Sequence, residues 1–243
     1  MAITSTQQTD ILKVVAGLFN AAPGGTNLSD LANAVDGGMT IKQLANVLAS
    51  NTLFTNGIMA GKVTTDAQAA VLMNNFGLVA DNTTTSAGSQ ALAYFKAQID
   101  AGVGFGDIVF DAVTFLSTTT DATFTTAATL LANKALVAES YSASNSSSDL
   151  SVLQNVVSTV TGAAPFTAAD VATVLAALSD DVAPAVTAPA GNFSFTENQA
   201  AAATLATIAA TDNVAVTGFE IASGNDSGFF AIDAAGKITL TTA

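Results

Sequence analysis

Proline is absent from a long stretch of the chain, between Pro23 and Pro165. Because proline removes a helical hydrogen bond and clashes with the preceding turn, a stretch without it can form uninterrupted helices. Apolar residues recur there at helical spacing, as at Leu44 and Leu48. The pattern predicts a mainly α N-terminal domain over residues 1–178, a helical bundle of about nine short helices.

Residues that favour helix ends stand where the apolar pattern starts and stops. Thr40, Thr64 and Asp149 precede apolar segments, and each offers a side-chain oxygen to a free N–H group of the first turn. Gly38 and Gly102 follow apolar segments and can take the left-handed conformation that ends a helix. We therefore expect helices to begin and end at these positions.

Part of the helical stretch is repeated. A shift of 64 residues aligns Asp36 with Asp100 and Gly38 with Gly102, along with apolar residues on both sides. Each copy predicts a helix, an acidic-glycine turn and a second helix. One such unit cannot bury its apolar face alone, so the duplicated helix-turn-helix units are expected to share a core.

The sequence pattern changes at residue 179. Pro184 and Pro189 end the helices and keep the chain extended, which makes residues 179–190 a linker. From 191 to 243 the alternation of apolar and polar residues predicts β-strands at 192–196, 204–211, 215–221, 229–232 and 237–240. Five such strands are typical of part of an all-β sandwich.

Several kinds of chemistry are excluded by composition. The chain has no histidine and no cysteine, which excludes Ser–His triads, cysteine nucleophiles and zinc fingers. Any metal must be bound by oxygen, which favours calcium or magnesium. The net charge of −13, with six lysines and no arginine, excludes nucleic acid as a partner. No segment is apolar and long enough for a transmembrane helix.

The C-terminal part carries ordered motifs of a known family. It resembles the first half of a cadherin-like calcium-dependent repeat, with the motifs in residues 193–198, 210–212, 228–233 and 236–240. Val214 stands where the family has a second aspartate. The resemblance implies that residues 191–243 form a truncated cadherin/Ig-like sandwich, the chain being a fragment of a longer protein.

Calcium is the cofactor that this resemblance implies. It makes Glu197 and Asp212 candidate metal ligands, and cadherin-like arrays also place calcium between modules, where Asp180 and Asp181 stand here. Oxygen ligands on a flexible junction suit calcium, and binding there would stiffen the hinge. The alternative is a helix C-terminal turn with two solvated acids.

The helical part resembles the N-terminal anchoring regions of bacterial surface-layer (S-layer) proteins. The resemblance depends on the two turns that begin at Asp36 and Asp100 and on the abundance of Ala, Thr and Asn. It implies a non-enzymatic structural protein of the bacterial outer surface, which is secreted, attaches to lipopolysaccharide or another envelope saccharide, and self-associates into a lattice or filament. The alternatives are a large type I-secreted adhesin with tandem cadherin-like repeats, and a secreted hydrolase with an acid/base pair at Asp107 and Asp111, four residues apart on one helix.

Attachment to an anionic envelope requires a local reversal of charge. Residues 1–178 carry twelve acids and five lysines, a net charge of −7. Clustered lysines, or calcium that bridges carboxylates, can supply that reversal. We expect the saccharide to contact Asp36, Lys42, Lys96 and Asp100, around the two repeated turns. The alternative is that the lysines are scattered over the bundle and only increase solubility.

Overall fold

The chain forms two units, each with its own internal contacts. The computed structural model describes residues 3–178, 185–187, 202–211, 216 and 218–241. Contacts divide the chain into Met1–Ala176 and Ala177–Ala243, next to the position at which the sequence pattern changes.

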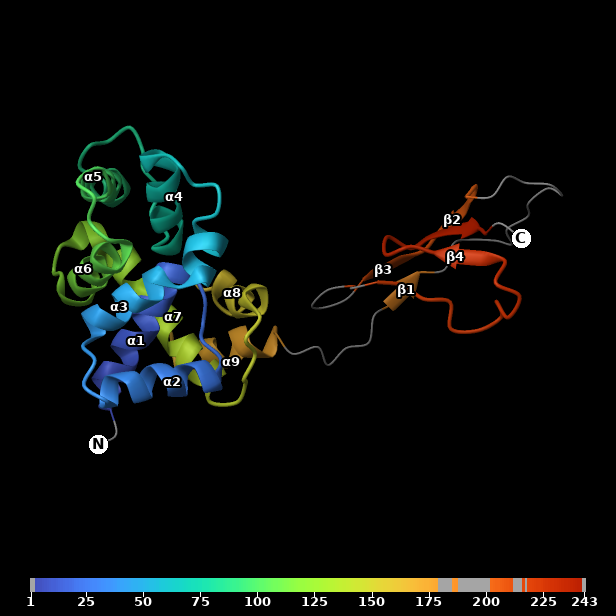
Figure 1. Cartoon of the computed structure of the whole chain (residues 1–243), viewed down its shortest axis with the longest axis horizontal. Coiled ribbons are helices and arrows are strands. Elements are labelled where there is room, and N and C mark those ends of the chain that lie inside the picture. The colour runs from blue at the N-terminus through green and yellow to red at the C-terminus, as the bar shows by residue number, and fades with distance from the viewer. Residues whose placement is uncertain (1–2, 179–184, 188–201, 212–215, 217, 242–243) are drawn as a thin grey trace. The chain divides into compact units, whose positions relative to one another are not determined.

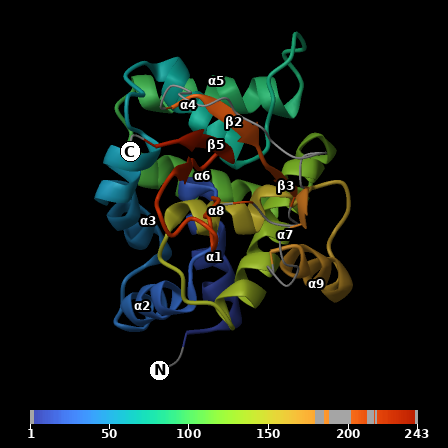
Figure 2. The ribbon, with the colours of Figure 1, turned by 90° about the vertical axis from the view of Figure 1, so that its right-hand side faces the viewer.

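The first unit is a bundle of nine α helices among the described residues, which confirms the mainly helical prediction. The helices are α1 (Ser5–Phe19), α2 (Gly25–Asp36), α3 (Ile41–Ser50), α4 (Thr65–Asn75), α5 (Ala87–Asp100), α6 (Phe105–Thr118), α7 (Thr125–Ser142), α8 (Leu150–Ser158) and α9 (Ala168–Ala176). A π-helical segment, η1 (Leu53–Ile58), follows α3, and a 3-10 turn, η2 (Ala122–Phe124), precedes α7. Figures 1 and 2 show α4 and α5 together at one end of the bundle and α2 at the other.

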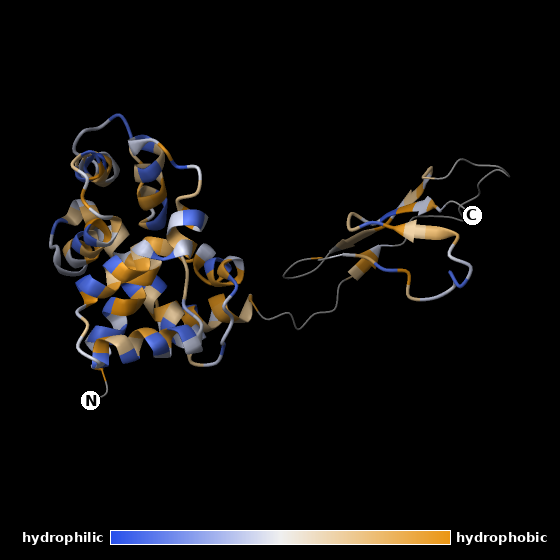
Figure 3. Ribbon diagram, in the orientation of Figure 1, coloured by the Kyte–Doolittle hydropathy of each residue, from blue (hydrophilic) through white to orange (hydrophobic). Residues whose placement is uncertain are grey.

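Helix α1 lies at the centre of the core. Ile11, Leu12, Val14 and Leu18 are completely buried, and α1 packs against α7, α6 and α3. The apolar residues of the ribbon gather on the inner sides of the helices in Figure 3. Each large aliphatic side chain buried in this way contributes about 1.5–3 kcal/mol to folding, so α1 is the element around which the other helices assemble.

The expected caps form. Thr40 accepts a hydrogen bond from the backbone of Gln43, Thr64 does so from Ala67, and Asp149 caps the first turn of α8. The hydrogen bonds at Asp149, the first of them from Ser151, hold the pKa of that carboxyl below its usual value. These caps satisfy N–H groups that have no partner within their own helix.

The two repeated turns have the same hydrogen-bond pattern. Gly38 and Gly102 have φ angles of 103° and 74°, in the left-handed region. In each turn the N–H of the residue after this glycine donates to the carbonyl five residues back, at 3.1 and 3.0 Å. The second helices of the two units, α3 and α6, pack directly against each other, and Gly106 lies so close to the backbone of Asn46 that a Cβ there would clash.

Polar side chains from other helices close the C-terminus of α1. The buried side chain of Asn75 donates from Nδ2 to the carbonyl oxygens of Gly17 and Leu18, at 2.9 and 3.0 Å. Buried Lys134 donates from Nζ to Asn20 Oδ1 at 2.6 Å and to Asn75 O at 2.7 Å. The carbonyl groups at this helix end are thus satisfied without water.

The second unit consists of two small antiparallel sheets. Its strands are β1 (Ala185–Thr187), β2 (Thr204–Thr207), β3 (Ala209–Thr211), β4 (Phe230–Ile232) and β5 (Lys237–Leu240). One sheet has the order β2-β5-β4, and the other pairs β1 with β3. The chain passes from one sheet to the other at Ile208, whose N–H donates to Gly236 O at 2.8 Å.

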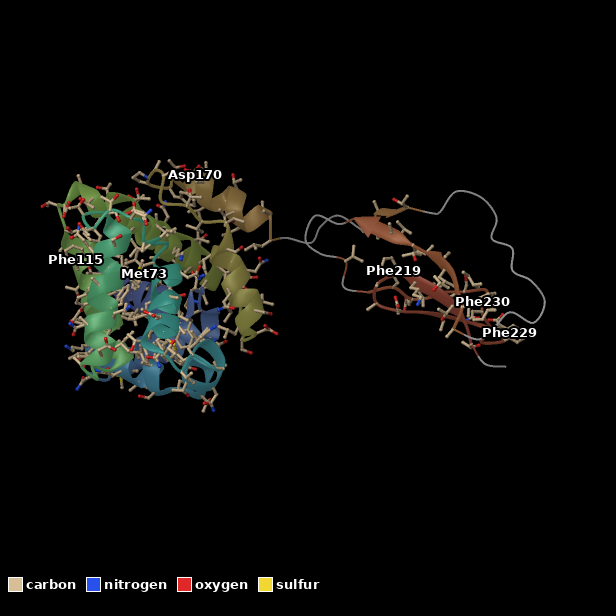
Figure 4. All side chains as sticks on the ribbon, turned by 90° about the horizontal axis from the view of Figure 1, so that it is seen from above. Met73, Phe115, Asp170, Phe219, Phe229 and Phe230 are labelled. Atoms are coloured by element: carbon tan, nitrogen blue, oxygen red, sulfur yellow. The ribbon has the colours of Figure 1, made fainter. Side chains whose placement is uncertain are left out.

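Two of the strands predicted for this unit differ from those in the structure, and a third falls on residues that the structure does not describe. The strand expected over 204–211 is two strands, because Ile208 bonds to the turn at Gly236 instead of to a neighbouring strand. The strand expected over 215–221 is absent from its described residues. There the Phe219 ring, labelled in Figure 4, lies close to the backbone of Gly236. The strand expected over 192–196 falls outside the described residues. The described residues thus form small sheets and not a complete sandwich.

Candidate functional site

A groove of about 660 Å³ opens between α1, α3 and α6, and we call it the α1/α3/α6 groove. Six of its side chains carry hydroxyl groups: Thr6, Thr9, Thr40, Thr114, Ser117 and Thr118. Its charged and aromatic side chains are Lys13, Lys42, Asp10 and Phe110. These groups are suited to a sugar ligand. Hydroxyl groups bind sugar hydroxyls, ammonium groups bind acidic substituents, and an aromatic ring packs on the apolar face of a sugar ring.

The two lysines of the groove are held differently. Lys13 Nζ donates to Ser117 Oγ at 2.9 Å, which links α1 to α6. Lys42 Nζ lies 5.6 Å from the centre of the Phe110 ring and remains about half exposed, at 48% of its side-chain area. Both ammonium groups keep further N–H donors for a ligand, because a lysine has three and needs few of them here.

Two carboxylates and an amide hold Lys42 in place. Asp107 and Asp111 lie 3.6 and 3.9 Å from Lys42 Nζ, and Asn46 Nδ2 donates to Asp107 Oδ1 at 2.8 Å. The spacing of four residues does place both carboxylates on one side of a helix, as the sequence indicates. In the folded chain that side faces a lysine, so their arrangement positions a cation.

The threonines of the groove have little rotational freedom. Thr9, Thr114 and Thr118 donate their hydroxyl protons to carbonyls one turn back in their own helices, at 3.0, 2.9 and 2.9 Å. Thr40 is held by its capping interaction with Gln43. Because the protons are used within the helices, the hydroxyl oxygens are left to accept hydrogen bonds, as sugar hydroxyl groups require.

The other lysine of the expected saccharide site belongs to a different contact. Lys96 Nζ lies 2.6 Å from Asp66 Oδ1, and that hydrogen bond raises the pKa of Lys96. Asp100 accepts a hydrogen bond from Thr65 Oγ1 at 2.6 Å. These pairs join α5 to α4. Asp36 is the exposed last residue of α2. Of the four expected residues, only Lys42 is part of the α1/α3/α6 groove.

Sequence reasoning missed Phe110 and Ser117, and it included Lys13 only as one of five lysines able to cluster on one face. Helical spacing does place Phe110, Thr114 and Ser117 on one face of their helix, which was a usable signal. The opposite wall comes from α1, more than ninety residues earlier. Nothing in the local pattern relates these two segments, so only the fold brings Lys13 to Ser117.

The expected calcium ligands Asp180, Asp181, Glu197 and Asp212 all lie outside the described residues. Within the part of the chain that is described, no group of three or more acidic side chains is close enough to hold a metal ion. Over the same residues, no helix has the combined length and apolar character required to cross a membrane.

Compared with known proteins, the chain matches no family model, and no curated protein or solved structure shows significant similarity to it.

Proposed function

We propose that the chain is a structural protein of the bacterial cell surface, an S-layer subunit whose helical domain attaches to outer-membrane lipopolysaccharide. The observation that carries this proposal is the α1/α3/α6 groove, with Lys13 and Lys42 among six hydroxyl side chains. No chemical step is involved, because the groove offers hydrogen bonds and charge to a ligand and needs no nucleophile.

The chemistry of the groove favours a saccharide with acidic substituents. The two ammonium groups can form charge-assisted hydrogen bonds with phosphate or carboxylate groups. The hydroxyl oxygens accept hydrogen bonds from sugar hydroxyls, and the Phe110 ring offers an apolar surface to a sugar ring. Asp10 at the groove favours ligands with hydroxyl donors near that carboxylate, which adds selectivity.

Calcium is the second part of the proposal. The helical domain carries twelve acids and five lysines, so long-range repulsion opposes binding to an anionic envelope. Calcium that bridges carboxylates of the protein and phosphates of the saccharide would offset this repulsion. We also propose that Asp180 and Asp181, in the linker segment of the sequence, bind calcium, supported by their oxygen-only chemistry.

The β unit is proposed to continue the protein outward as part of a cadherin-like sandwich. Support comes from its two antiparallel sheets and from the segment that leaves one sheet for the other at Ile208. Chains that change sheets at a corner are a feature of packed sandwiches. We propose that copies of the whole protein associate into a lattice or filament on the cell surface.

The test compares two double variants of the full chain for binding to immobilised lipopolysaccharide. In Lys13→Ala/Lys42→Ala both groove cations are removed, while Lys62→Ala/Lys96→Ala removes the same charge elsewhere on the helical domain. Loss of two charge-assisted hydrogen bonds is expected to weaken binding about tenfold or more. The control is expected to bind within about twofold of the unaltered chain, because exposed ion pairs contribute little.

Chelation provides the second arm of the same experiment. With EDTA present, binding of the unaltered chain is expected to weaken, and added calcium is expected to restore it. Asp180→Asn/Asp181→Asn is expected to reduce the calcium effect. Equal weakening by both lysine variants would contradict the groove assignment, and no binding with calcium present would contradict attachment to lipopolysaccharide.

A further inference from the structure

A second cavity, of about 410 Å³, lies on the other side of α6, between α5, α6 and η2. Its walls are aromatic. Phe76 and Phe95 stack at 6.0 Å between ring centres on one side, and Phe115 contacts Phe124 edge-on at 5.0 Å on the other. Helix α5 packs mainly on α4 and only lightly on α6, which leaves this space unfilled.

Two aromatic rings remain open to solvent at the mouth of this cavity. Phe115 is 45% exposed and Tyr94 is 36% exposed, and Phe115 lies at the outer edge of the helical unit in Figure 4. Burying large aromatic surface is strongly favourable, so a ligand with an apolar body gains free energy by covering both rings. A volume of this size accommodates a small organic molecule.

The charge at the mouth selects among apolar ligands. Asp111 and Asp121 both line the cavity. Hydrogen bonds from Thr123 hold the pKa of Asp121 below its usual value, so its carboxylate is charged at neutral pH. Burial, and then the charge of Asp111, raise the pKa of Tyr94, so the phenol stays neutral beside that carboxylate. Lys42 lies 3.9 Å from Asp111 and offsets part of its charge, so Asp121 supplies most of the negative charge that favours cations over fatty acids and other anions here.

We propose that this cavity binds a small organic ammonium ion with an apolar body, held between the aromatic rings and the carboxylates of Asp111 and Asp121. An ammonium group is attracted to the faces of aromatic rings as well as to carboxylates. The apolar body of the ligand fills the space over Phe76 and Phe124. The cavity lies across α6 from the α1/α3/α6 groove and shares one contact with it, because Asp111 also lies 3.9 Å from Lys42 Nζ. The proposal does not depend on saccharide binding in the groove.

The two tyrosines of the chain make the test direct. Tyr94 lines the cavity, Tyr141 is buried on α7, and the chain has no tryptophan. In the full chain with Tyr141→Phe, Tyr94 is therefore the sole fluorophore. We would titrate this protein with benzyltrimethylammonium, with benzyl alcohol as the uncharged compound and with phenylacetate as the anion. A ligand of this size is expected to bind with a dissociation constant of about 0.1–1 mM.

We expect the ammonium ion to bind most tightly, benzyl alcohol less tightly and phenylacetate most weakly. The dissociation constant of the cation is expected to be at least about tenfold lower than that of the anion. Asp111→Asn/Asp121→Asn is expected to weaken binding of the cation about threefold to thirtyfold and to leave benzyl alcohol unchanged. Asparagine keeps the oxygen that caps η2. Asp30→Asn/Asp226→Asn, which removes the same charge at exposed positions that do not line the cavity, is expected to have little effect.

The proposal is overturned if Tyr94 fluorescence does not respond to the ammonium ion, or if phenylacetate binds as tightly. It is also overturned if the two aspartate pairs weaken binding equally, because the effect would then reflect net charge. A Phe115→Ala variant checks the apolar wall: cation binding is expected to fall about threefold or more while the thermal unfolding midpoint changes little, since this ring is half exposed.

Discussion

Lys134 is a cation in the core, only 4% exposed, that bonds to Asn20 and Asn75 at the ends of α1 and α4. Burial lowers the pKa of Lys134 to about 8, from an ordinary value of 10.5. The C-terminal ends of two helices favour a positive charge at this point, which explains how a lysine can occupy the core with an amide oxygen and a backbone carbonyl as its partners.

The shifted pKa predicts that stability depends on pH. Below about pH 8 the lysine is protonated in both states, and folding bears the full cost of burying the charge. Between about pH 8 and 10.5 the folded chain loses this proton while the unfolded chain keeps it, so the free energy of unfolding rises with pH. The whole rise is about 3 kcal/mol at most. Urea unfolding at pH 7.5 and 9.5 spans part of this rise, and the expected increase in the free energy of unfolding between the two is about 2 kcal/mol.

Lys134→Met is expected to remove this rise, because the variant has no group there to titrate. Lys62→Met, at an exposed position, is expected to keep it. A rise of equal size in both variants would show that Lys134 is not its source.

Asn75 holds the end of α1 through two hydrogen bonds to carbonyl oxygens and is 4% exposed. Asn75→Ala leaves both carbonyls without these donors in the core, and the expected loss of stability is about 2–3 kcal/mol. Asn74→Ala changes the same residue type one position earlier, where the side chain is exposed, and is expected to cost less than about 0.5 kcal/mol. Thermal unfolding of both variants decides the comparison, and similar losses would contradict the account.

At the scale of elements, the close packing of α3 on α6 positions one wall of the α1/α3/α6 groove. Gly106→Ala adds a Cβ that clashes with the backbone of Asn46, so α3 must move away from α6. We expect a loss of about 1–3 kcal/mol in stability and weaker lipopolysaccharide binding, because Lys42 is carried by α3. Gly57→Ala is the control, since a Cβ there meets nothing within 4 Å. Normal stability and binding in Gly106→Ala would refute this role for the helix contact.

Local signals predict helix ends well and helix neighbours poorly. The caps at Thr40 and Thr64 and the turns at Gly38 and Gly102 follow from residue chemistry within a few positions, and the structure has them. The exchange of sheets at Ile208 depends on a bond to a distant turn, and no local pattern contains it.

In the candidate site, too, the sequence predicts single residues better than it predicts their neighbours in space. Lys42 could be singled out from the sequence as a cation beside a turn. Its partners Asp107 and Asp111, and the second lysine, Lys13, come from other helices. Lys96 stands at a similar place beside the repeated turn, yet in the folded chain it pairs with Asp66. Sequence periodicity identifies which face of a helix is polar, but only tertiary packing decides which polar faces meet.

At the scale of the whole molecule, the division into two units predicts different folding behaviour for the two parts. Residues 1–178 contain their own core and caps and are expected to fold alone, with a helical circular dichroism spectrum and one cooperative thermal transition. Residues 179–243 bury few large apolar side chains among those described and leave sheet edges exposed, so alone they are expected to lack a cooperative transition. A sharp β-type transition in the short piece would contradict this expectation.

We propose above all that an acidic protein attaches to an acidic envelope through one groove, in which the ammonium groups of Lys13 and Lys42 contact the ligand. The most direct measurement is amide NMR of the full chain during titration with a phosphorylated core oligosaccharide of lipopolysaccharide, with calcium present. The account predicts that shift changes concentrate around Lys13, Lys42 and Ser117 and disappear in Lys13→Ala/Lys42→Ala. Shift changes confined to residues 185–241, or none on α1, α3 and α6, would contradict it.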